Sequence, residues 1–124
     1  MIFGIGVDIL RQERMEKVWT RHGDKLVQRI LCEAERQEFA QSNKPVRFLT
    51  MAFAAKEACV KALGTGFHGV SYRDVGSVHE DSGKPVLVFS AKLQKRLTKL
   101  GIVSSHVSLS DEGGLVCAMV VLER

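Results

Sequence analysis

Hydrophobic and small or polar residues alternate at the start of the chain, a pattern typical of a β-strand over residues 2–10. The opposite face carries Gly4, Gly6 and Asp8. Glycine within a strand often marks the close approach of a ligand or another backbone, so Asp8 would point into a space kept open. The alternative is a polar strand end that faces water, and the sequence alone does not decide between them. The apolar face would carry Phe3, Ile5, Val7 and Ile9.

Three short helices are predicted in the first third of the chain. The first covers residues 11–21, where one-turn spacing relates Met15, Val18 and Trp19. The sequence "RHGD" breaks it, and Asp24 can cap a second helix that carries Leu26, Val27, Ile30 and Leu31. A third helix over residues 33–41 ends at "SNKP", because proline disfavours helical backbone at the residue before it.

A long fourth helix is predicted from Pro45 to Leu63, with Pro45 in its first turn and Gly64 as its C-terminal stop. Strand-like segments then flank the turn "EDSGKP", and a helix over 91–100 precedes the strands "SSHVSLS" and "LVCAMVVL". No repeat or linker interrupts this order. The sequence therefore predicts one α+β domain over residues 1–124, with a mainly antiparallel sheet and a long central helix.

Composition and charge narrow the class of protein. The chain has 124 residues, of which 45% are hydrophobic and 26% charged, as in an ordinary globular domain. A domain this small would enclose a large ligand more readily with a second copy of the chain. Its net charge of +4 is compatible with nucleic acid, an anionic membrane, a phosphate-rich small molecule or an acidic protein as partner.

Targeting signals and metal-binding cysteines are not apparent in the sequence. The apolar N-terminus has no basic region before it and is too short to span a bilayer. The three cysteines lack the spacing of metal ligands and suit a reducing compartment. We therefore expect a cytoplasmic protein without a membrane partner.

The segment "FAAKEACVKALGTG" carries candidate chemistry. Glu57, Lys61 and Gly64 fall at i, i+4 and i+7, on one helical face. Taken alone, the segment favours a solvated Glu–Lys pair, worth about 0.2–0.5 kcal/mol in a helix, followed by a helix cap. Asp8 changes this interpretation, since two carboxylates suit Mg²⁺, which leaves coordination positions for water and phosphates. Lys61 would then face a phosphate, which the glycine backbone at 64 and 66 would approach.

A cationic surface is the second candidate feature. Arg14, Lys17 and Arg21 fall close to one face of the first predicted helix, beside apolar side chains. An acidic amphipathic helix of a partner protein would suit such a surface. The alternative is a solvated face above a core stripe. Nucleic-acid binding and a purely structural trimer are less favoured, because neither function explains the two carboxylates Asp8 and Glu57.

Several motifs together resemble one family. These are "GIGVDI", "RF" followed by "FAAKEACVKALGTG", "GKP" and "HVSLSDE", in the same order and spacing over essentially the whole chain. The chain resembles holo-acyl carrier protein synthase, the short homotrimeric type of 4′-phosphopantetheinyl transferase. The resemblance implies that fold, and transfer of phosphopantetheine from coenzyme A to a serine of apo acyl carrier protein in fatty acid biosynthesis. The reaction, which releases adenosine 3′,5′-bisphosphate, is a phosphoryl transfer that depends on alignment and charge neutralisation.

The resemblance also implies roles for individual residues. Asp8 and Glu57 match the family's magnesium carboxylates, and Lys61 matches a lysine beside the diphosphate. Arg14 and Arg21 match positions that receive the acidic recognition helix of acyl carrier protein. The coenzyme A cleft lies between adjacent subunits in the family, and it would be lined by Gly64, Thr65, Gly66, Lys84, Pro85, His106 and Ser108.

Some questions stay open at this point. From the residues alone, His106, Ser108 and Lys84 have ordinary structural interpretations, on an edge strand and in a hairpin. Family members commonly have a basic residue where this chain has Ala52, and nothing in the sequence shows that another cation replaces it. Both Mg²⁺ and Mn²⁺ accept octahedral oxygen sites. A metal-bound water, Asp8 or Glu57 would each be able to take the serine proton, and our hypothesis is a water held by the metal and Glu57.

Overall fold

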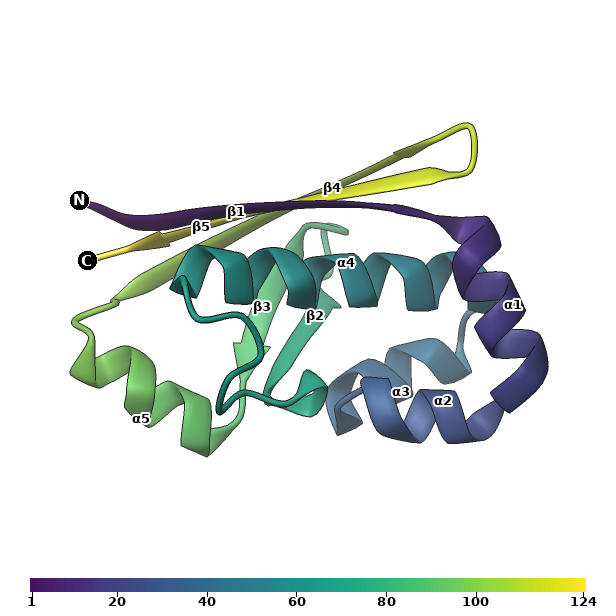
Figure 1. The fold of residues 1–124 in the computed structure, drawn as a ribbon, viewed down its shortest axis with the longest axis horizontal. Coiled ribbons are helices and arrows are strands. Elements are labelled where there is room, and N and C mark those ends of the chain that lie inside the picture. The colour runs from purple at the N-terminus through teal and green to yellow at the C-terminus, as the bar shows by residue number, and fades with distance from the viewer.

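The chain folds into helices and antiparallel strands in the predicted order (Figure 1). The structure, a computed structural model, describes residues 1–124. Its elements are β1 (Ile2–Arg11), α1 (Gln12–His22), α2 (Asp24–Ile30), α3 (Glu33–Ala40), α4 (Pro45–Leu63), the 3₁₀ turn η1 (Tyr72–Asp74), β2 (Val75–His79), β3 (Pro85–Phe89), α5 (Ala91–Lys99), β4 (Ser104–Glu112) and β5 (Leu115–Glu123). The predicted α+β class with a long central helix is confirmed. None of the helices combines the length and apolarity needed to cross a bilayer.

The strands form two antiparallel sheets rather than one. The first has the order β1-β5-β4, and β2 and β3 form a separate hairpin. The two chain ends lie side by side at one end of the first sheet, where backbone hydrogen bonds join Met1 and Arg124 (Figure 1). Helix α4 crosses the inner face of this sheet and also contacts β2, so it is the element that both sheets share.

The glycine face of β1 packs directly on the backbone of α4. A Cβ atom added at Gly4 would collide with the carbonyl oxygen of Ala62, and one at Gly6 with that of Ala58. The expectation of a space kept open for a ligand is therefore wrong for most of this face. The glycines serve the close approach of another backbone, and only Asp8, farther along the strand, lies near the edge of the helix.

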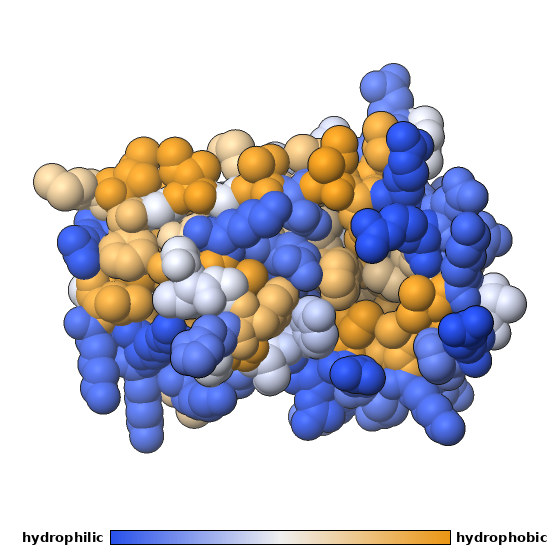
Figure 2. Space-filling model, in the orientation of Figure 1, coloured by the Kyte–Doolittle hydropathy of each residue, from blue (hydrophilic) through white to orange (hydrophobic).

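The outer face of β1 is apolar and exposed. Ile5, Val7 and Ile9 are 59%, 54% and 64% exposed, and Met119 of β5 lies opposite Val7 in the register. Figure 2 shows apolar side chains along the side of the molecule where β1 runs. Phe3 departs from the predicted face, because an irregularity between Ile2 and Gly4 shifts the register and Phe3 packs against the core.

Local backbone geometry explains how the helices begin and end. Gly64 closes α4 in the left-handed conformation at φ 84°, as the sequence predicts. Asp24 is not the cap of α2, since Gly23 occupies that position at φ 51° and Asp24 lies in the first turn. In the first turn a carboxylate still favours the helix through the helix dipole.

Candidate active site

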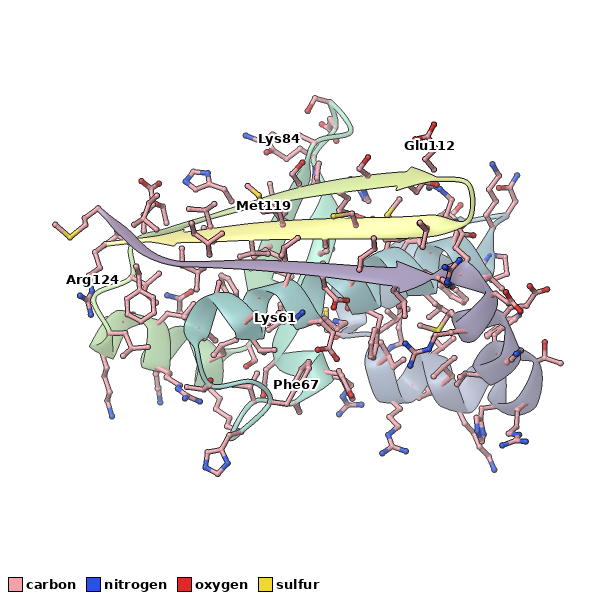
Figure 3. All side chains as sticks on the ribbon, turned by 45° about the horizontal axis from the view of Figure 1, so that its top comes forward. Lys61, Phe67, Lys84, Glu112, Met119 and Arg124 are labelled. Carbon is pink, nitrogen blue, oxygen red and sulfur yellow. The ribbon has the colours of Figure 1, made fainter.

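Asp8, Glu57 and Lys61 converge where β1 meets α4. Lys61 Nζ lies 3.3 Å from Asp8 Oδ1 and donates a hydrogen bond to the carbonyl oxygen of Val7 at 2.9 Å. Figure 3 shows Lys61 on α4 beside β1, with Phe67 in the loop that follows the helix. The solvated Glu–Lys pair suggested by the helix alone does not form, because the ammonium turns to the strand instead.

Glu57 is left without a hydrogen-bond or ion-pair partner. Burial raises the pKa of Glu57 above its usual value, the negative charge of Asp8 raises it further, and Lys61 lowers it. The carboxylates of Asp8 and Glu57 are therefore close enough to repel each other, and the positive charge of Lys61 relieves this repulsion only in part. Such a pair suits a hard cation, which would remove the repulsion. No cluster of three or more His, Cys, Asp or Glu side chains is present, so the side chains at this position offer two carboxylates and no larger group.

The glycine-rich loop after α4 exposes its backbone next to this site. Gly64 and Gly66 have positive φ angles of 84° and 59°, and both are exposed. The Thr65 hydroxyl makes only a local hydrogen bond, to the Gly66 carbonyl at 3.2 Å. The loop leads to Phe67, whose ring lies 4.5 Å from that of Tyr72. The backbone of residues 64–66 is thus accessible to a ligand.

The β2–β3 hairpin places Lys84 and Pro85 beside a small cavity. The cavity has a volume of about 210 Å³, and its lining includes Ala52, Ser77 and Pro85. The hydroxyl of Ser77 is buried and has no hydrogen-bond partner. Lys84 itself is exposed and immediately precedes β3.

Arg47 lines the same cavity as Ala52, which stands where a basic residue was expected, and it is already engaged. Its guanidinium makes two hydrogen bonds to Asp111, at 2.9 and 3.1 Å, across the mouth of the same cavity as Ala52. The hydrogen bond from Arg47 lowers the pKa of the Asp111 carboxyl. The positive charge of Arg47 is thus already paired with a carboxylate of β4.

His106 and Ser108 lie on the other side of the sheet from Asp8. Both are exposed, because on β4 they alternate with Val107 and Leu109, which pack inward. His106 Nε2 lies 2.6 Å from Glu123 Oε1. The single chain therefore does not bring His106 and Ser108 to the carboxylates.

An apolar groove with a basic rim lies between α1, α2 and α4. Its volume is about 440 Å³, and Figure 2 shows an apolar hollow bordered by hydrophilic side chains over these helices. Arg14 lines this groove, but Arg21 lies outside it, in a separate depression beside Lys17. Phe53 lines the groove one turn before Glu57 on α4, so the groove adjoins the carboxylate site. Other lining residues are Leu10, Met15, Lys25, Leu26, Arg29 and Ile30.

Sequence reasoning missed a buried ion pair next to the site. Lys56 Nζ lies 2.5 Å from Glu35 Oε1, and both side chains are fully buried. The sequence carried one sign of this pair. Lys56 lies among small and apolar residues, such as Ala55 and Cys59, on the buried side of α4. A lysine there is retained only with a buried acidic partner.

The fold is that of a 4′-phosphopantetheinyl transferase. The sequence profile of the 4′-phosphopantetheinyl transferase superfamily matches residues 4–120. The chain belongs to the holo-[acyl-carrier-protein] synthase family. It is 41% identical to the holo-[acyl-carrier-protein] synthase of Nitrosospira multiformis, over 100% of both chains.

Solved structures support this assignment. The crystal structure of holo-[acyl-carrier-protein] synthase from Neisseria meningitidis matches 100% of both chains, with a TM-score of 0.96 and 43% identity. The enzyme from Bacillus anthracis, solved in complex with coenzyme A (3′,5′-ADP), has a TM-score of 0.80 and 37% identity, over 98% of this chain and 96% of that chain. The family suggested by the sequence motifs is thus confirmed.

Proposed function

We propose that this protein transfers the 4′-phosphopantetheine arm of coenzyme A to a serine of apo acyl carrier protein, releasing adenosine 3′,5′-bisphosphate. The observation that carries the proposal is the convergence of Asp8, Glu57 and Lys61 in a chain of this family. Phosphoryl transfer needs little covalent participation from the protein, and these groups supply charge and position. Membership of the family also supports a cytoplasmic location and a role in fatty acid biosynthesis.

Mg²⁺ is the cofactor that we propose, with Mn²⁺ as an alternative. Asp8 and Glu57 would hold it, since Glu57 has no other partner and its pKa is raised by burial and by Asp8. When bound, the ion would neutralise charge on the diphosphate and lower the pKa of a coordinated water. Glu57 would hold a water beside the serine hydroxyl, and this water would take the serine proton.

Lys61 would stabilise the diphosphate of coenzyme A. Its side chain is 52% exposed, and its hydrogen bond to Val7 holds the ammonium at the open edge of the site. An ammonium in this position would interact with negative oxygens of the substrate and of the leaving bisphosphate. Asp8 fixes the direction in which the ammonium points.

Coenzyme A would extend from the carboxylates toward the hairpin. The exposed backbone of Gly64, Thr65 and Gly66 would face its phosphates, and Lys84 and Pro85 would contact the nucleotide end. The hydroxyl of Ser77, which has no partner, would accept or donate a hydrogen bond if a ligand group reached it from the adjoining cavity. The Bacillus anthracis relative was solved with coenzyme A.

The site would be completed by a second subunit of a homotrimer. The apolar residues of the outer sheet face, Ile5, Val7, Ile9 and Met119, are more exposed than a lone soluble chain favours. A neighbour packed there would bring its His106 and Ser108 to the coenzyme A cleft. This arrangement also explains how 124 residues enclose a large substrate.

Acyl carrier protein would dock on the groove between α1 and α2. Arg14 at its rim, together with Lys25 and Arg29, would attract an acidic helix, and the apolar lining would receive a hydrophobic side chain. The groove adjoins Glu57 through Phe53, so the docked helix would present its serine to the site. Arg21, outside the groove, would extend the basic surface along α1.

The direct test mixes the purified protein with apo acyl carrier protein, coenzyme A and Mg²⁺, and measures the intact mass of the carrier. We expect the mass of phosphopantetheine to be added to one serine, and a chelator to abolish the addition. No added mass would contradict the transfer reaction. Added mass that persists under chelation would contradict the role of the metal.

A further inference from the structure

Strand β2 has one edge without a strand partner, and side chains of α3 and α4 cover it. Its other edge pairs with β3. On the free edge, Ser77 N–H donates to Glu35 Oε2 at 2.9 Å, and His79 N–H donates to Glu38 Oε2 at 2.8 Å. Lys56 Nζ donates to the Val75 carbonyl oxygen. Three side chains thus take the place of a neighbouring strand.

Two of these side chains form a buried ion pair with fixed geometry. Glu35 and Lys56 are each 0% exposed, and their charged atoms lie 2.5 Å apart. Glu35 Oε1 also accepts a hydrogen bond from the N–H of Cys32 at 3.1 Å, at the start of α3. Charges removed from water remain charged only when they are paired and hydrogen-bonded. The pair therefore has little freedom to shift, and neither does the strand that it holds.

Glu38 extends the same contact toward the open end of the hairpin. Besides the backbone bond, Glu38 Oε1 lies 2.8 Å from Nδ1 of His79, the last residue of β2. Glu35 and Glu38 lie three residues apart on α3, so both carboxylates face β2. The two carboxylates accept hydrogen bonds from Ser77 and His79, which lie two residues apart on the strand and so present their N–H groups on the same edge.

This anchoring matters because the hairpin does not belong to the three-stranded sheet. Strand β3 is not paired with β4, so no backbone ladder fixes the hairpin relative to β1 and its Asp8. His79 is paired with Pro85, one residue after Lys84. Lys56 lies next to Glu57 in the chain, so α4 holds the hairpin and the carboxylate site at adjacent positions.

We propose that Glu35, Glu38 and Lys56 are positioning residues that fix the hairpin tip relative to the carboxylate site and thereby set the affinity for coenzyme A. The inference rests on the proposed function, in which the tip contacts the nucleotide end. None of the three touches the reacting atoms. Their loss changes KM for coenzyme A, whereas kcat at saturation and KM for the carrier stay close to the wild-type values.

Glu38→Ala is the first test, because Glu38 lies at the surface and its removal leaves the core intact. KM for coenzyme A should rise about threefold to tenfold, because both contacts of Glu38 with His79 are lost and each hydrogen bond is worth about 0.5–1.5 kcal/mol. Glu38→Gln should restore much of the affinity, since the amide oxygen can accept the same His79 N–H. Glu33→Ala is the matched control, because Glu33 is on the same helix but exposed and makes no hydrogen bond or ion pair.

The buried pair is tested by the double variant Glu35→Met with Lys56→Met. Replacement of both charges by apolar side chains of similar volume can preserve stability, whereas removal of only one leaves a buried charge unpaired. The double variant should keep the unfolding temperature within a few degrees while hydrogen exchange at the Ser77 amide accelerates. Its KM for coenzyme A should rise as in Glu38→Ala.

The variants test the positioning role, and the wild-type protein tests the proposed function. An unchanged KM in Glu38→Ala together with faster exchange at His79 would overturn the positioning role. A parallel fall of kcat and of unfolding temperature in all variants would do the same, since it indicates general destabilisation. If the wild-type protein formed no holo carrier, the proposed function itself would fail, and that result is independent of the variants.

Discussion

Lys61 of α4 pairs with Asp8 of β1, across 3.3 Å, and not with Glu57 one turn before it on its own helix. The contact joins two elements that lie far apart in the sequence. Gly4 and Gly6 allow β1 to pack on the backbone of α4, and this close packing brings Asp8 within reach of Lys61. The pairing leaves Glu57 free for another positive group, so the arrangement resembles a metal site more than a surface salt bridge.

Replacement of Lys61 should slow the transfer reaction without unfolding the protein. We expect Lys61→Met to reduce kcat about 100-fold or more, by analogy with the loss of one preorganised electrostatic contact to a transition state. Lys61→Arg keeps the charge and should retain more activity. Initial rates of holo carrier formation measure the effect, with exposed Lys99→Met on α5 as the control. Equal rates for Lys61→Met and the control would refute the role of Lys61.

Removal of a carboxylate should weaken metal binding even in the absence of substrate. Glu57→Gln keeps the size of the side chain but removes its charge, so we expect at least about a tenfold loss of affinity, the scale of 1.4 kcal/mol. Mn²⁺ binding followed by electron paramagnetic resonance gives this value directly. Glu112→Gln, at the exposed end of β4, is the control. A Glu57→Gln protein with normal affinity and normal turnover would contradict both the metal role and the base role.

The contact between Gly6 and α4 should tolerate no side chain. In Gly6→Ala the added Cβ would meet the Ala58 carbonyl, so strand and helix must separate. We expect the free energy of unfolding to fall by about 3 kcal/mol or more. Gly113→Ala has open space and only a positive φ of 58°, which should cost about 1 kcal/mol. Urea unfolding monitored by circular dichroism compares the two. If the two variants lost similar amounts of unfolding free energy, β1 would be able to move away from the helix at little cost.

Mixed subunits test whether the site is shared. Asp8→Asn and His106→Ala should each be nearly inactive, because they disable opposite sides of the same interfacial site. If the two variants are unfolded and refolded together in equal amounts, about a quarter of the sites should combine the intact sides, by random assortment in a cyclic trimer. Activity should rise accordingly, and light scattering should give the mass of three chains. No recovery in a confirmed mixed trimer would place the two residues in separate sites.

Asp74 should make stability depend on acid pH. Its burial by itself raises the pKa, but hydrogen bonds from Ser90 and Ser71 and the nearby Lys92 lower the pKa below its ordinary value of 3.8. A lowered folded pKa means that the stabilisation is complete above 3.8 and is lost as pH falls through the folded value. Asp74→Asn should therefore be less stable at pH 6, by about 1.5–3 kcal/mol.

The same comparison at lower pH checks the sign of the effect. The difference in free energy of unfolding between the wild type and Asp74→Asn should shrink as pH falls below 3.8, the ordinary pKa of the carboxyl. Urea unfolding at a series of pH values measures this difference. A constant difference across the series would show that the charge of Asp74 does not contribute.

The order of elements was predictable because it depends on local signals. Pro45 and Gly64 delimit the long helix in the sequence as they do in the structure, where Gly64 has the left-handed backbone expected of a helix cap. The strand alternation around His106 also held, since Val107 and Leu109 face inward. The division into two sheets was not predictable, because it depends on which strands meet after the chain folds.

The site was predictable only in part. The proximity of Asp8 and Glu57 followed from combining two separate segments, and their chemical roles stay predictions. The partner of Lys61 was not predictable, because spacing along the helix pointed to Glu57. Lys56 was missed for a similar reason, since its partner Glu35 lies 21 residues away and on another helix.

The two faces of β1 make the strand sensitive to its own alignment. Successive residues face opposite sides, so a shift of one residue against β5 would exchange the faces. Asp8 would then leave the site, and isoleucine and valine side chains would meet the α4 backbone where not even a methyl group fits. The glycines therefore do more than admit the helix. They exclude the wrong pairing of the two strands, and the protein cannot close its core until the acidic side chain is on the correct side.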